Sequence, residues 1–231
     1  MSQQRTYREF IYKEAVFRIC CEAFEVITAE IVRQRQILED YIARHPEFGT
    51  AFEPIAVLPD APPSAQQMAH AADRVGTGPM AAVAGTMAQL AACNGIDAGA
   101  NEAIVENGGD IYLQTTESVV IGLYPGASEL AGQLGFSLKA EDTPISICSS
   151  SGKMGHSTSL GQCDLATVLS KDAALADAAA TQAANFVRMA EDVEPTLNRI
   201  LAIDGVDGVL IVKDKQFGMA GHLPPLVKIH N

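Results

Sequence analysis

The sequence predicts an α+β protein with mixed or antiparallel sheets. Strand-like and helix-like segments do not alternate strictly along the chain, as they would in a doubly wound parallel sheet. Several segments rich in β-branched and aromatic residues instead follow one another with only short turns between them. Two helix-like segments are rich in alanine, and each follows a loop of small residues. This last feature suggests two similar halves, although no strict sequence repeat supports them.

The first 63 residues are expected to form strands, a helix and a connector. Residues 7–28 alternate and carry many aromatic and β-branched side chains, which predicts two or three antiparallel strands. Apolar residues recur at near-helical spacing over 29–45, and Pro46 should end that helix. Five prolines between 46 and 63 indicate a loop or connector.

The rest of the chain, residues 64–231, is expected to carry the functional motifs within one domain spanning 1–231. Pro79 follows a glycine and marks a helix start, and Asn94-Gly95 should mark its end. The predicted helices cover 64–75, 79–93, 172–190 and 192–203. Strands are predicted three times over 102–123, twice over 135–148 and as a hairpin over 208–219, with a small-residue loop over 149–162.

Composition restricts the class of partner. The chain has 28 acidic and 16 basic residues and a net charge of −12, so a nucleic acid or an anionic membrane surface is not an expected partner. Hydrophobic residues make up 48% and charged residues 19%, which excludes a disordered chain. The five cysteines form no C-x-x-C pair, so we expect buried, reduced thiols. The sequence shows no signal peptide or membrane-spanning stretch, and a cytoplasmic location is expected.

Asp177 and Thr181 are the candidate metal ligands. They are four residues apart on the second alanine-rich helix, so both oxygen atoms lie on one side of it. A carboxylate and a hydroxyl, completed by a backbone carbonyl, are hard oxygen ligands that suit Mg²⁺. The alternative is structural: the aspartate interacts with the positive end of its own helix, and the threonine bonds to the preceding turn.

Two glycine-containing motifs are candidate ligand-binding segments. Gly78 lies just before the helix that starts at Pro79, whose first-turn N–H groups have no acceptor within the helix and are suited to a diphosphate. Asn107, Gly108, Gly109 and Asp110 separate two hydrophobic runs and allow close backbone contact with a ligand. An ordinary helix cap and an ordinary turn are the simpler explanations of these two motifs.

The loop over 149–162 contains the candidate catalytic residues. Ser151 and Gly152 are followed by Lys153, and His156 is suited to acid–base chemistry near neutral pH. A serine hydrolase elbow would need G-x-S-x-G between a strand and a helix. The stretch that starts at Gly155 lacks the last glycine, which argues against that class.

The string VENGGDIYL at 105–113 resembles the N-x-G-G-D-I stretch of the ApbE-like superfamily, which includes flavin transferases that split FAD with Mg²⁺ and attach FMN to a Thr or Ser of a target protein. The order of the motifs over 76–190 is also similar: a small-residue helix with Gly85, then the NGGD stretch, Ser-Gly, a histidine and D-A-x-x-T. The resemblance implies Mg²⁺ held by Asp177, Thr181 and a backbone carbonyl near Ala81 or Ala82.

The resemblance further implies the roles of the other motif residues. His156 and Ser151 would be catalytic, and the flavin, FAD or FMN, would contact a set of mostly small residues: Gly78, Asn107, Gly108, Gly109, Asp110 and Gly152. Lys153, beside the Ser-Gly pair, is a further candidate cofactor-binding residue, as a cation that could replace the lysine of the family. The expected partners are a small nucleotide ligand and an acceptor protein for FMN transfer. A homo-oligomer is also considered, although no sequence feature fixes the oligomeric state.

The sequence departs from the superfamily pattern at three points. Ala84 replaces the usual lysine before the glycine, Gln89 replaces an acid, and no Asp-Pro follows His156. The leading hypothesis is a protein that binds a flavin or related nucleotide diphosphate with Mg²⁺ and cleaves the diphosphate or transfers FMN. The alternatives are a non-catalytic ligand-binding or assembly protein with the same fold, and another enzyme that uses the Ser/His loop.

Overall fold

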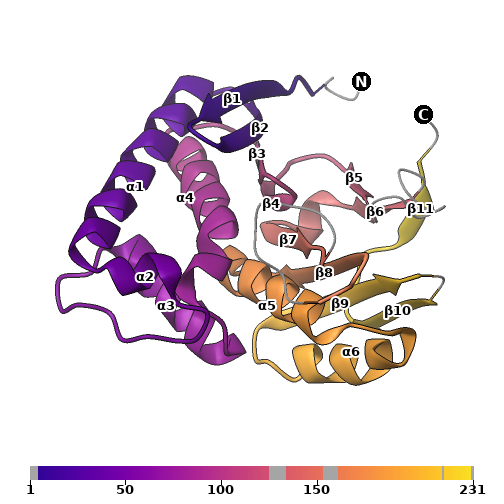
Figure 1. The fold of residues 1–231 in the computed structure, drawn as a ribbon. Coiled ribbons are helices and arrows are strands. Elements are labelled where there is room, and N and C mark those ends of the chain that lie inside the picture. Colours follow the sequence, from indigo (N-terminus) through magenta and orange to yellow (C-terminus); the bar gives the residue numbers. More distant parts are fainter. Residues whose placement is uncertain (1–4, 125–133, 153–160, 215, 230–231) are drawn as a thin grey trace.

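An eight-stranded antiparallel sheet forms the centre of the computed structural model, which describes residues 5–124, 134–152, 161–214 and 216–229 (Figure 1). Its strand order is β1-β2-β3-β4-β7-β8-β9-β10, and every neighbouring pair is antiparallel. The strands are β1 (Arg8–Tyr12), β2 (Ala15–Cys21), β3 (Ala103–Asn107), β4 (Asp110–Gln114), β7 (Ile145–Ser150), β8 (Leu165–Ser170), β9 (Val206–Lys213) and β10 (Gln216–Gly221). The predicted α+β class with antiparallel sheets is confirmed.

A smaller antiparallel sheet of order β11-β6-β5 covers one face of the large sheet, and the helices cover the other (Figure 1). Its strands are β5 (Val119–Leu123), β6 (Leu134–Leu138) and β11 (Leu226–Lys228). The helices are α1 (Phe24–Arg44), α2 (Pro46–Thr50), α3 (Pro63–Val75), α4 (Val83–Asp97), α5 (Ala173–Phe186) and α6 (Val193–Leu201), with short 3-10 helices η1 (Pro79–Ala82), η2 (Ala140–Asp142) and η3 (Ala190–Asp192).

Alternation along the strands produces two hydrophobic cores. In β8, Ala166 and Val168 face the helices, whereas Leu165 and Leu169 face the smaller sheet. Successive side chains of a strand point to opposite faces, so a strand in the middle of these three layers is buried on both. All six residues of β8 are buried for this reason.

The large sheet consists of two topologically similar halves. In the first half, residues 8–114, a β1–β2 pair leads through helices α1–α4 to a β3–β4 pair. In the second half, residues 145–221, a β7–β8 pair leads through α5 and α6 to a β9–β10 pair. Strands β4 and β7 join the halves, and α4 packs against α5 on the helical face.

The structure corrects several predicted boundaries. Helix α1 begins at Phe24 instead of residue 29, so residues 7–28 hold two strands and a helix start. The connector over 46–63 contains the short helix α2, and the helix predicted over 79–93 consists of η1 followed by α4, which continues to Asp97. Strands β8 and β11 were not predicted. No disulfide joins the five cysteines, as expected, and Cys20, Cys148 and Cys163 are buried, whereas Cys21 and Cys93 are half-buried. None of the described helices has the length and apolar character needed to cross a membrane.

Candidate functional site

Asp177 lies on α5 at the contact between the two halves. Its side chain is only 7% exposed, and its Oδ2 accepts a hydrogen bond of 2.8 Å from the backbone N–H of Gly85 in the first turn of α4. Alanines flank Asp177 on its own helix, and small side chains let α4 approach closely. The carboxylate therefore caps the N-terminus of a helix from the other half, where partial positive charge favours an anion.

Gly85 is required for this approach. A Cβ atom placed on it would lie 2.4 Å from the carbonyl oxygen of Ala173 and 3.0 Å from the Cβ of Asp177. Both neighbouring groups belong to α5, and the first is backbone that cannot rotate away. The internal glycine of the first small-residue helix and the aspartate of the second are therefore a matched pair in space.

The NGGD stretch forms the turn between β3 and β4 beside this contact. Asn107 pairs with Asp110 across the hairpin, and Gly108 and Gly109 have φ values of 66° and 110°, a backbone conformation that favours glycine at both turn positions. The side-chain amide of Asn107 donates to the carbonyl oxygen of Ala84 at 3.3 Å. The stretch is thus a turn, as its simpler interpretation predicts, and it also contacts the first turn of α4.

Asp110 brings a second buried carboxylate to this region. It is 8% exposed, and its Oδ1 has no hydrogen-bond partner among the described residues. Burial raises the pKa of Asp110 to about 7, although the neighbouring Cys148 thiol and the backbone N–H of Ser149 act to lower it. Burial likewise raises the pKa of Asp177, and the charge of Asp110 adds to the rise.

These two carboxylates lack a basic counter-ion within the part of the chain that the structure describes, where no Lys or Arg forms an ion pair with either of them. The buried thiol of Cys148 lies near both, and burial together with their charges raises its pKa as well. Buried negative charge is costly unless a proton or a cation neutralises it. The two buried carboxylates therefore favour the binding of a proton or of a cation.

The raised pKa of Asp110 leads to a testable dependence of stability on pH. A proton is held more tightly in the folded chain than in the unfolded chain, where the ordinary pKa is 3.8, so stability should fall as the pH rises from about 4 to about 7. We expect Asp110→Asn to remove part of this fall. Urea unfolding between pH 4 and pH 8 without divalent cations measures it, and an identical slope in parent and variant would contradict the expectation.

Thr181 lies one turn beyond Asp177 on α5, half-buried. Helix α5 packs against η1, which contains the Ala81 and Ala82 backbone expected to complete the metal site. The carbonyl oxygen of Ala82 accepts a bond of 2.6 Å from the Thr86 hydroxyl, and Ala82 is also the residue directly before α4. The three predicted oxygen donors thus come from elements that are in contact.

Ser151 and Gly78 lie in tightly packed positions. The Ser151 hydroxyl donates to the carbonyl oxygen of Cys163 at 3.3 Å, and the side chain is buried. Gly78 packs on Ala51, whose carbonyl oxygen would lie 1.8 Å from an added Cβ atom. The helical turn after Gly78 is of the 3-10 type, so the α-helix begins only at Val83, five residues after Gly78.

Of the remaining candidate residues in the Ser/His loop, one lies within the described residues and two lie outside them. Gly152 is described, and its N–H donates to the Cys163 carbonyl at 2.9 Å. Lys153 and His156 lie outside the described residues, so their predicted roles in cofactor binding and catalysis remain predictions.

The sequence interpretation missed the residues that fix the start of α5. Asp172 caps this helix by accepting bonds from the N–H groups of Ala174 and Leu175 at 3.0 and 3.3 Å. Gln89 of α4 accepts a bond of 2.9 Å from the N–H of Ala173 and so ties α4 to the same turn. An aspartate directly before an alanine-rich run is a recognisable cap signal. The contact of Gln89 has no sequence signal of its own.

Comparison with known proteins gives a consistent family assignment. The model of a family described as AbpE bacteria matches residues 18–206. The UPF0280 protein of Methanococcus aeolicus is 41% identical over 202 residues, which cover 86% of this chain and 82% of that protein. The UPF0280 protein of Archaeoglobus fulgidus is 39% identical over 225 residues, covering 94% and 93%.

Solved structures with the same fold include flavin transferases. The flavin transferase ApbE from Vibrio cholerae superposes with a TM-score of 0.61 at 13% identity, covering 96% of this chain and 97% of that one. The ApbE protein of Thermotoga maritima gives a TM-score of 0.56 at 13% identity, covering 97% of each chain. At this level of identity the similarity establishes the ApbE-like fold alone.

Proposed function

Because this chain belongs to the AbpE bacteria family, together with the UPF0280 proteins, and has an ApbE-like fold, we propose that it binds a flavin nucleotide diphosphate with Mg²⁺ and cleaves the diphosphate or transfers FMN. The observation that carries the proposal is the pair of buried carboxylates, Asp110 and Asp177, at the contact between the halves. Neither has a basic partner among the described residues, and one oxygen of Asp110 has no hydrogen bond.

The donor set fits a hard divalent cation. Asp177 and Thr181 would hold Mg²⁺ together with a carbonyl oxygen of Ala81 or Ala82, and all three donors are oxygen atoms. When bound, Mg²⁺ would supply positive charge against the diphosphate and polarise its phosphorus–oxygen bonds. The hydrogen bond from the Gly85 N–H holds Oδ2 of Asp177 in place at the first turn of α4.

The surrounding residues would bind and orient the nucleotide. The Asn107–Asp110 turn offers backbone without side chains at Gly108 and Gly109, so a ligand can approach it closely. Ser151 and Gly152 would line the site from the second half, and His156 would hold or move a proton near the scissile bond. An acceptor hydroxyl of a target protein, or water in simple cleavage, would attack the phosphorus of the FMN half; the bond to the bridging oxygen breaks, AMP leaves, and the proton of the attacking group passes to a base such as His156.

The test compares the parent with Asp177→Asn. Asparagine keeps an oxygen that can accept the Gly85 N–H, so the fold should persist while the charge is lost. FAD is internally quenched, and FMN release brightens it. We expect a Mg²⁺-dependent rise in fluorescence from the parent and a loss of at least about 100-fold in rate from the variant, as for removal of a group that binds a catalytic metal.

A second readout separates binding from catalysis. We expect Mg²⁺ to raise the melting temperature of the parent and to leave that of Asp177→Asn unchanged, because only a ligand bound by the folded state stabilises it. Asp73→Asn, on the exposed side of α3, is the control and should behave as the parent does. An equal response to Mg²⁺ in parent and Asp177→Asn would rule out Asp177 as a ligand.

A non-catalytic binding protein is the second candidate. Ala84 in place of the superfamily lysine removes a cation from the first turn of α4. Saturable binding of FAD with no increase in brightness at any Mg²⁺ concentration would favour this candidate over the transferase.

A further inference from the structure

Ser150, the last residue of β7, has a buried hydroxyl oxygen that forms no hydrogen bond with any residue that the structure describes. Asp110, the first residue of the neighbouring strand β4, has a second such atom, its Oδ1. A buried polar atom without a partner destabilises the folded chain, so proteins keep few of them. Two of them on adjacent strands indicate a position that a ligand completes.

The two atoms lie on the same face of the large sheet. Cys148 lies in the core beneath the helices, and Ser150 follows it by two residues, so both face the helices. Asp110 faces the helices by the same alternation, because Tyr112 lies in that core. The carboxylate of Asp110 also interacts with the Cys148 thiol and with the backbone N–H of Ser149, which places it beside the end of β7.

The register of the two strands brings both side chains within reach of one ligand atom. Ile111 pairs with Ile147, and continuation of this pairing sets Asp110 opposite Cys148 and diagonal to Ser150. Diagonal neighbours in an antiparallel pair have Cβ atoms about 7 Å apart. A hydroxyl group that forms a bond of about 2.8 Å to each of the two oxygen atoms bridges such a gap.

The turn between β3 and β4 leaves this end of the strands uncrowded. A Cβ atom added to Gly108 would meet no atom within 4 Å, and one added to Gly109 would lie 3.7 Å from the carbonyl oxygen of Ser149. The turn therefore places no side chain over the end of β7. Ser150 itself is only half-buried, although its hydroxyl oxygen is buried.

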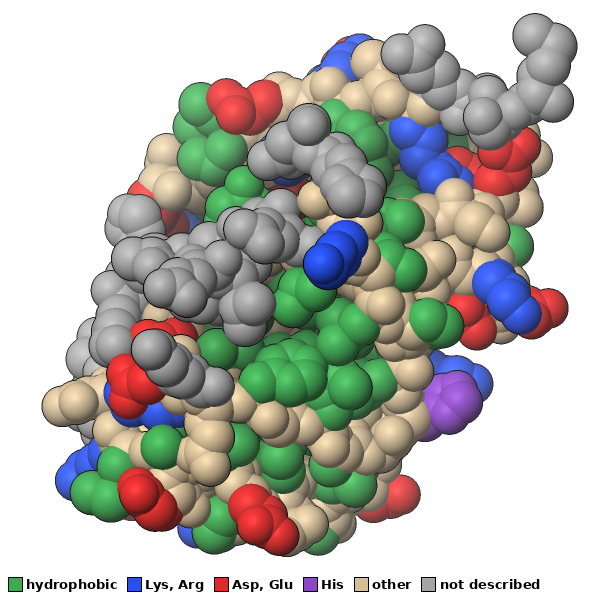
Figure 2. Space-filling model, turned by 90° about the vertical axis from the view of Figure 1, so that its right-hand side faces the viewer, with side chains coloured by type: hydrophobic (Ala, Val, Ile, Leu, Met, Phe, Trp, Pro, Cys, Tyr) green, Lys and Arg blue, Asp and Glu red, His purple; other side chains and the backbone are tan. Residues whose placement is uncertain are grey.

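The side of the molecule that carries the smaller sheet has a different character. Figure 2 shows the side on which β5, β6, β10 and β11 lie in Figure 1, and hydrophobic side chains gather at its centre. A surface of this kind binds apolar groups and does not orient a hydroxyl group. The polar part of a ligand therefore fits the helical face of the large sheet better.

We propose that Ser150 and Asp110 together bind one hydroxyl group of the sugar or sugar-alcohol part of the nucleotide, an inference that rests on the proposed function. A hydroxyl group both donates and accepts hydrogen bonds, so it can satisfy a carboxylate oxygen and a serine hydroxyl at once. A phosphate group only accepts and is negatively charged, and the buried carboxylates of Asp110 and Asp177 disfavour it here. Ser150 is thus a specificity-determining residue that orients the ligand.

Binding of two ligand fragments tests the proposal. FMN carries the ribityl chain and ADP carries the ribose, and neither contains the bond that the protein is proposed to cleave. With Mg²⁺ present, Ser150→Ala should raise the Kd of one of them about 3- to 10-fold, as for loss of one hydrogen bond. The fragment that is affected identifies the source of the hydroxyl group. Ser150→Thr keeps the hydroxyl and should restore the affinity of the parent.

Isothermal titration calorimetry measures these affinities. Unchanged Kd values for both fragments in Ser150→Ala would overturn the proposal, and so would a parent that binds neither fragment. The fluorescence comparison of the parent with Asp177→Asn decides the proposed function separately, so the two failures are distinguishable.

The stability of the ligand-free chain separates a ligand-binding role from a structural one. Because the Ser150 hydroxyl has no partner within the described part of the chain, Ser150→Ala should raise the melting temperature by about 2–4 °C while it weakens binding. A lower melting temperature would mean that the hydroxyl stabilises the fold, which contradicts the proposal.

Ser149→Ala and Thr115→Val are the matched controls. The hydroxyl of Ser149 lies 2.9 Å from that of Thr167 on the opposite face, so its removal should lower the melting temperature and leave both Kd values unchanged. Thr115, just beyond the other end of β4, has a buried hydroxyl that no described residue bonds. Its replacement should raise the melting temperature without affecting binding. If Thr115→Val weakened binding as much as Ser150→Ala, the assignment of Ser150 would be wrong.

Discussion

Replacement of Gly85 by alanine is expected to lower the free energy of unfolding by about 3 kcal/mol, although alanine is the better helix former. The new methyl group would lie 2.4 Å from the carbonyl oxygen of Ala173 and 3.0 Å from Asp177 Cβ, so α4 and α5 would have to separate. Separation would also stretch the 2.8 Å bond from the Gly85 N–H to Asp177. Urea unfolding at neutral pH measures the loss.

Gly95→Ala is the matched control for Gly85→Ala. Gly95 lies in the same helix, but an added Cβ atom there would meet the flexible end of Ile27 at 2.8 Å, not a backbone atom. Movement of Ile27 and the gain in helix propensity should keep its effect below about 1 kcal/mol. Equal stabilities of the two variants would mean that the α4–α5 contact is looser than described.

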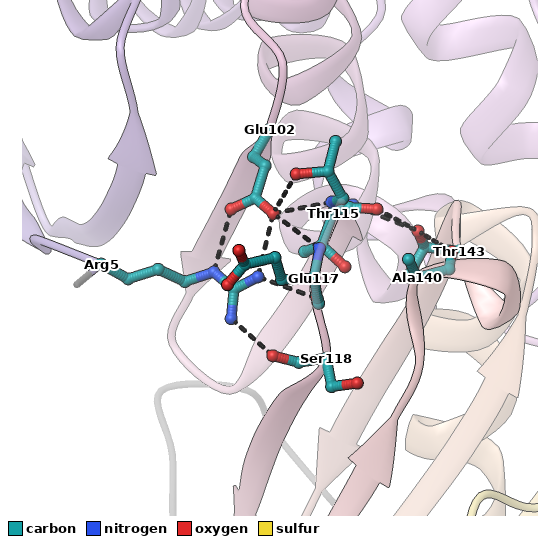
Figure 3. Close-up of polar contacts among 8 residues, drawn as sticks. Arg5, Glu102, Thr115, Glu117, Ser118, Ala140 and Thr143 are labelled. Atoms are coloured by element: carbon teal, nitrogen blue, oxygen red, sulfur yellow. Dashed lines mark hydrogen bonds and ion pairs between the residues drawn. The ribbon is translucent and has the colours of Figure 1, made fainter. Parts of the chain in front are cut away.

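Replacement of Glu102 by glutamine is the second change with a large expected effect. Figure 3 shows Glu102 bound by Arg5 on one side and by the segment after β4 on the other. Arg5 donates from Nε and Nη2 at 3.0 and 2.9 Å, and the Thr116 and Glu117 backbone N–H groups donate at 2.6 and 3.1 Å. Arg5 also reaches the Ser118 carbonyl at 2.8 Å, so the pair ties the chain start to the β4–β5 connection.

These bonds determine how stability should depend on pH. Burial acts to raise the pKa of Glu102, but the hydrogen bonds, first those from Arg5, outweigh it and lower the pKa to about 2 from the ordinary 4.5. The Arg5 and Glu102 side chains are only 16% and 17% exposed. The lowering of the Glu102 pKa from 4.5 to about 2 corresponds to about 3 kcal/mol of folding free energy at most. A lowered acid pKa stabilises the folded chain above pH 4.5, and this contribution disappears as the pH falls toward 2.

We therefore expect Glu102→Gln to cost about 2–3 kcal/mol at pH 7 and progressively less between pH 4.5 and pH 2.5. Glu106→Gln is the control, because Glu106 pairs with Arg18 at 3.3 Å in an exposed position where an ion pair contributes less than about 1 kcal/mol. Chemical unfolding at several pH values measures both variants. If the loss of unfolding free energy in Glu102→Gln did not change with pH, the effect of the substitution would come from altered packing or hydrogen bonding and not from the lost charge.

Segments with periodic hydrophobicity predicted most of the fold, whereas segments whose structure depends on long-range packing were not predicted correctly. The hairpins around the NGGD turn and over 208–219 follow from strand alternation and turn residues. Strand β8 was missed because burial on both faces removes alternation from its sequence. The start of α1 was assigned to a strand because Phe24 and Ile27 favour strands locally. In the structure Phe24 packs under the guanidinium of Arg8 at 3.5 Å, and Ile27 packs in the core.

The candidate site was predictable as a set of residues but not as a set of contacts. The spacing of Asp177 and Thr181 gives one helix face, and the resemblance to the ApbE-like superfamily adds the motif order. The bond from Gly85 to Asp177 joins residues 92 positions apart, and no local pattern encodes it. The end of α4 shows the same effect, since Asn94-Gly95 reads as a stop signal while Gly95 serves as a close contact for Ile27.

The division of the sheet into two similar halves has a consequence for the order of folding events. The first half supplies Gly85 and Asp110, and the second supplies Asp177 and Thr181, so an intermediate with one folded half lacks part of the proposed cation site. A cation or nucleotide that binds there would stabilise the state in which the two halves are in contact, and would slow the separation of strands β4 and β7. Ligand affinity in this protein would then report how firmly its halves stay together.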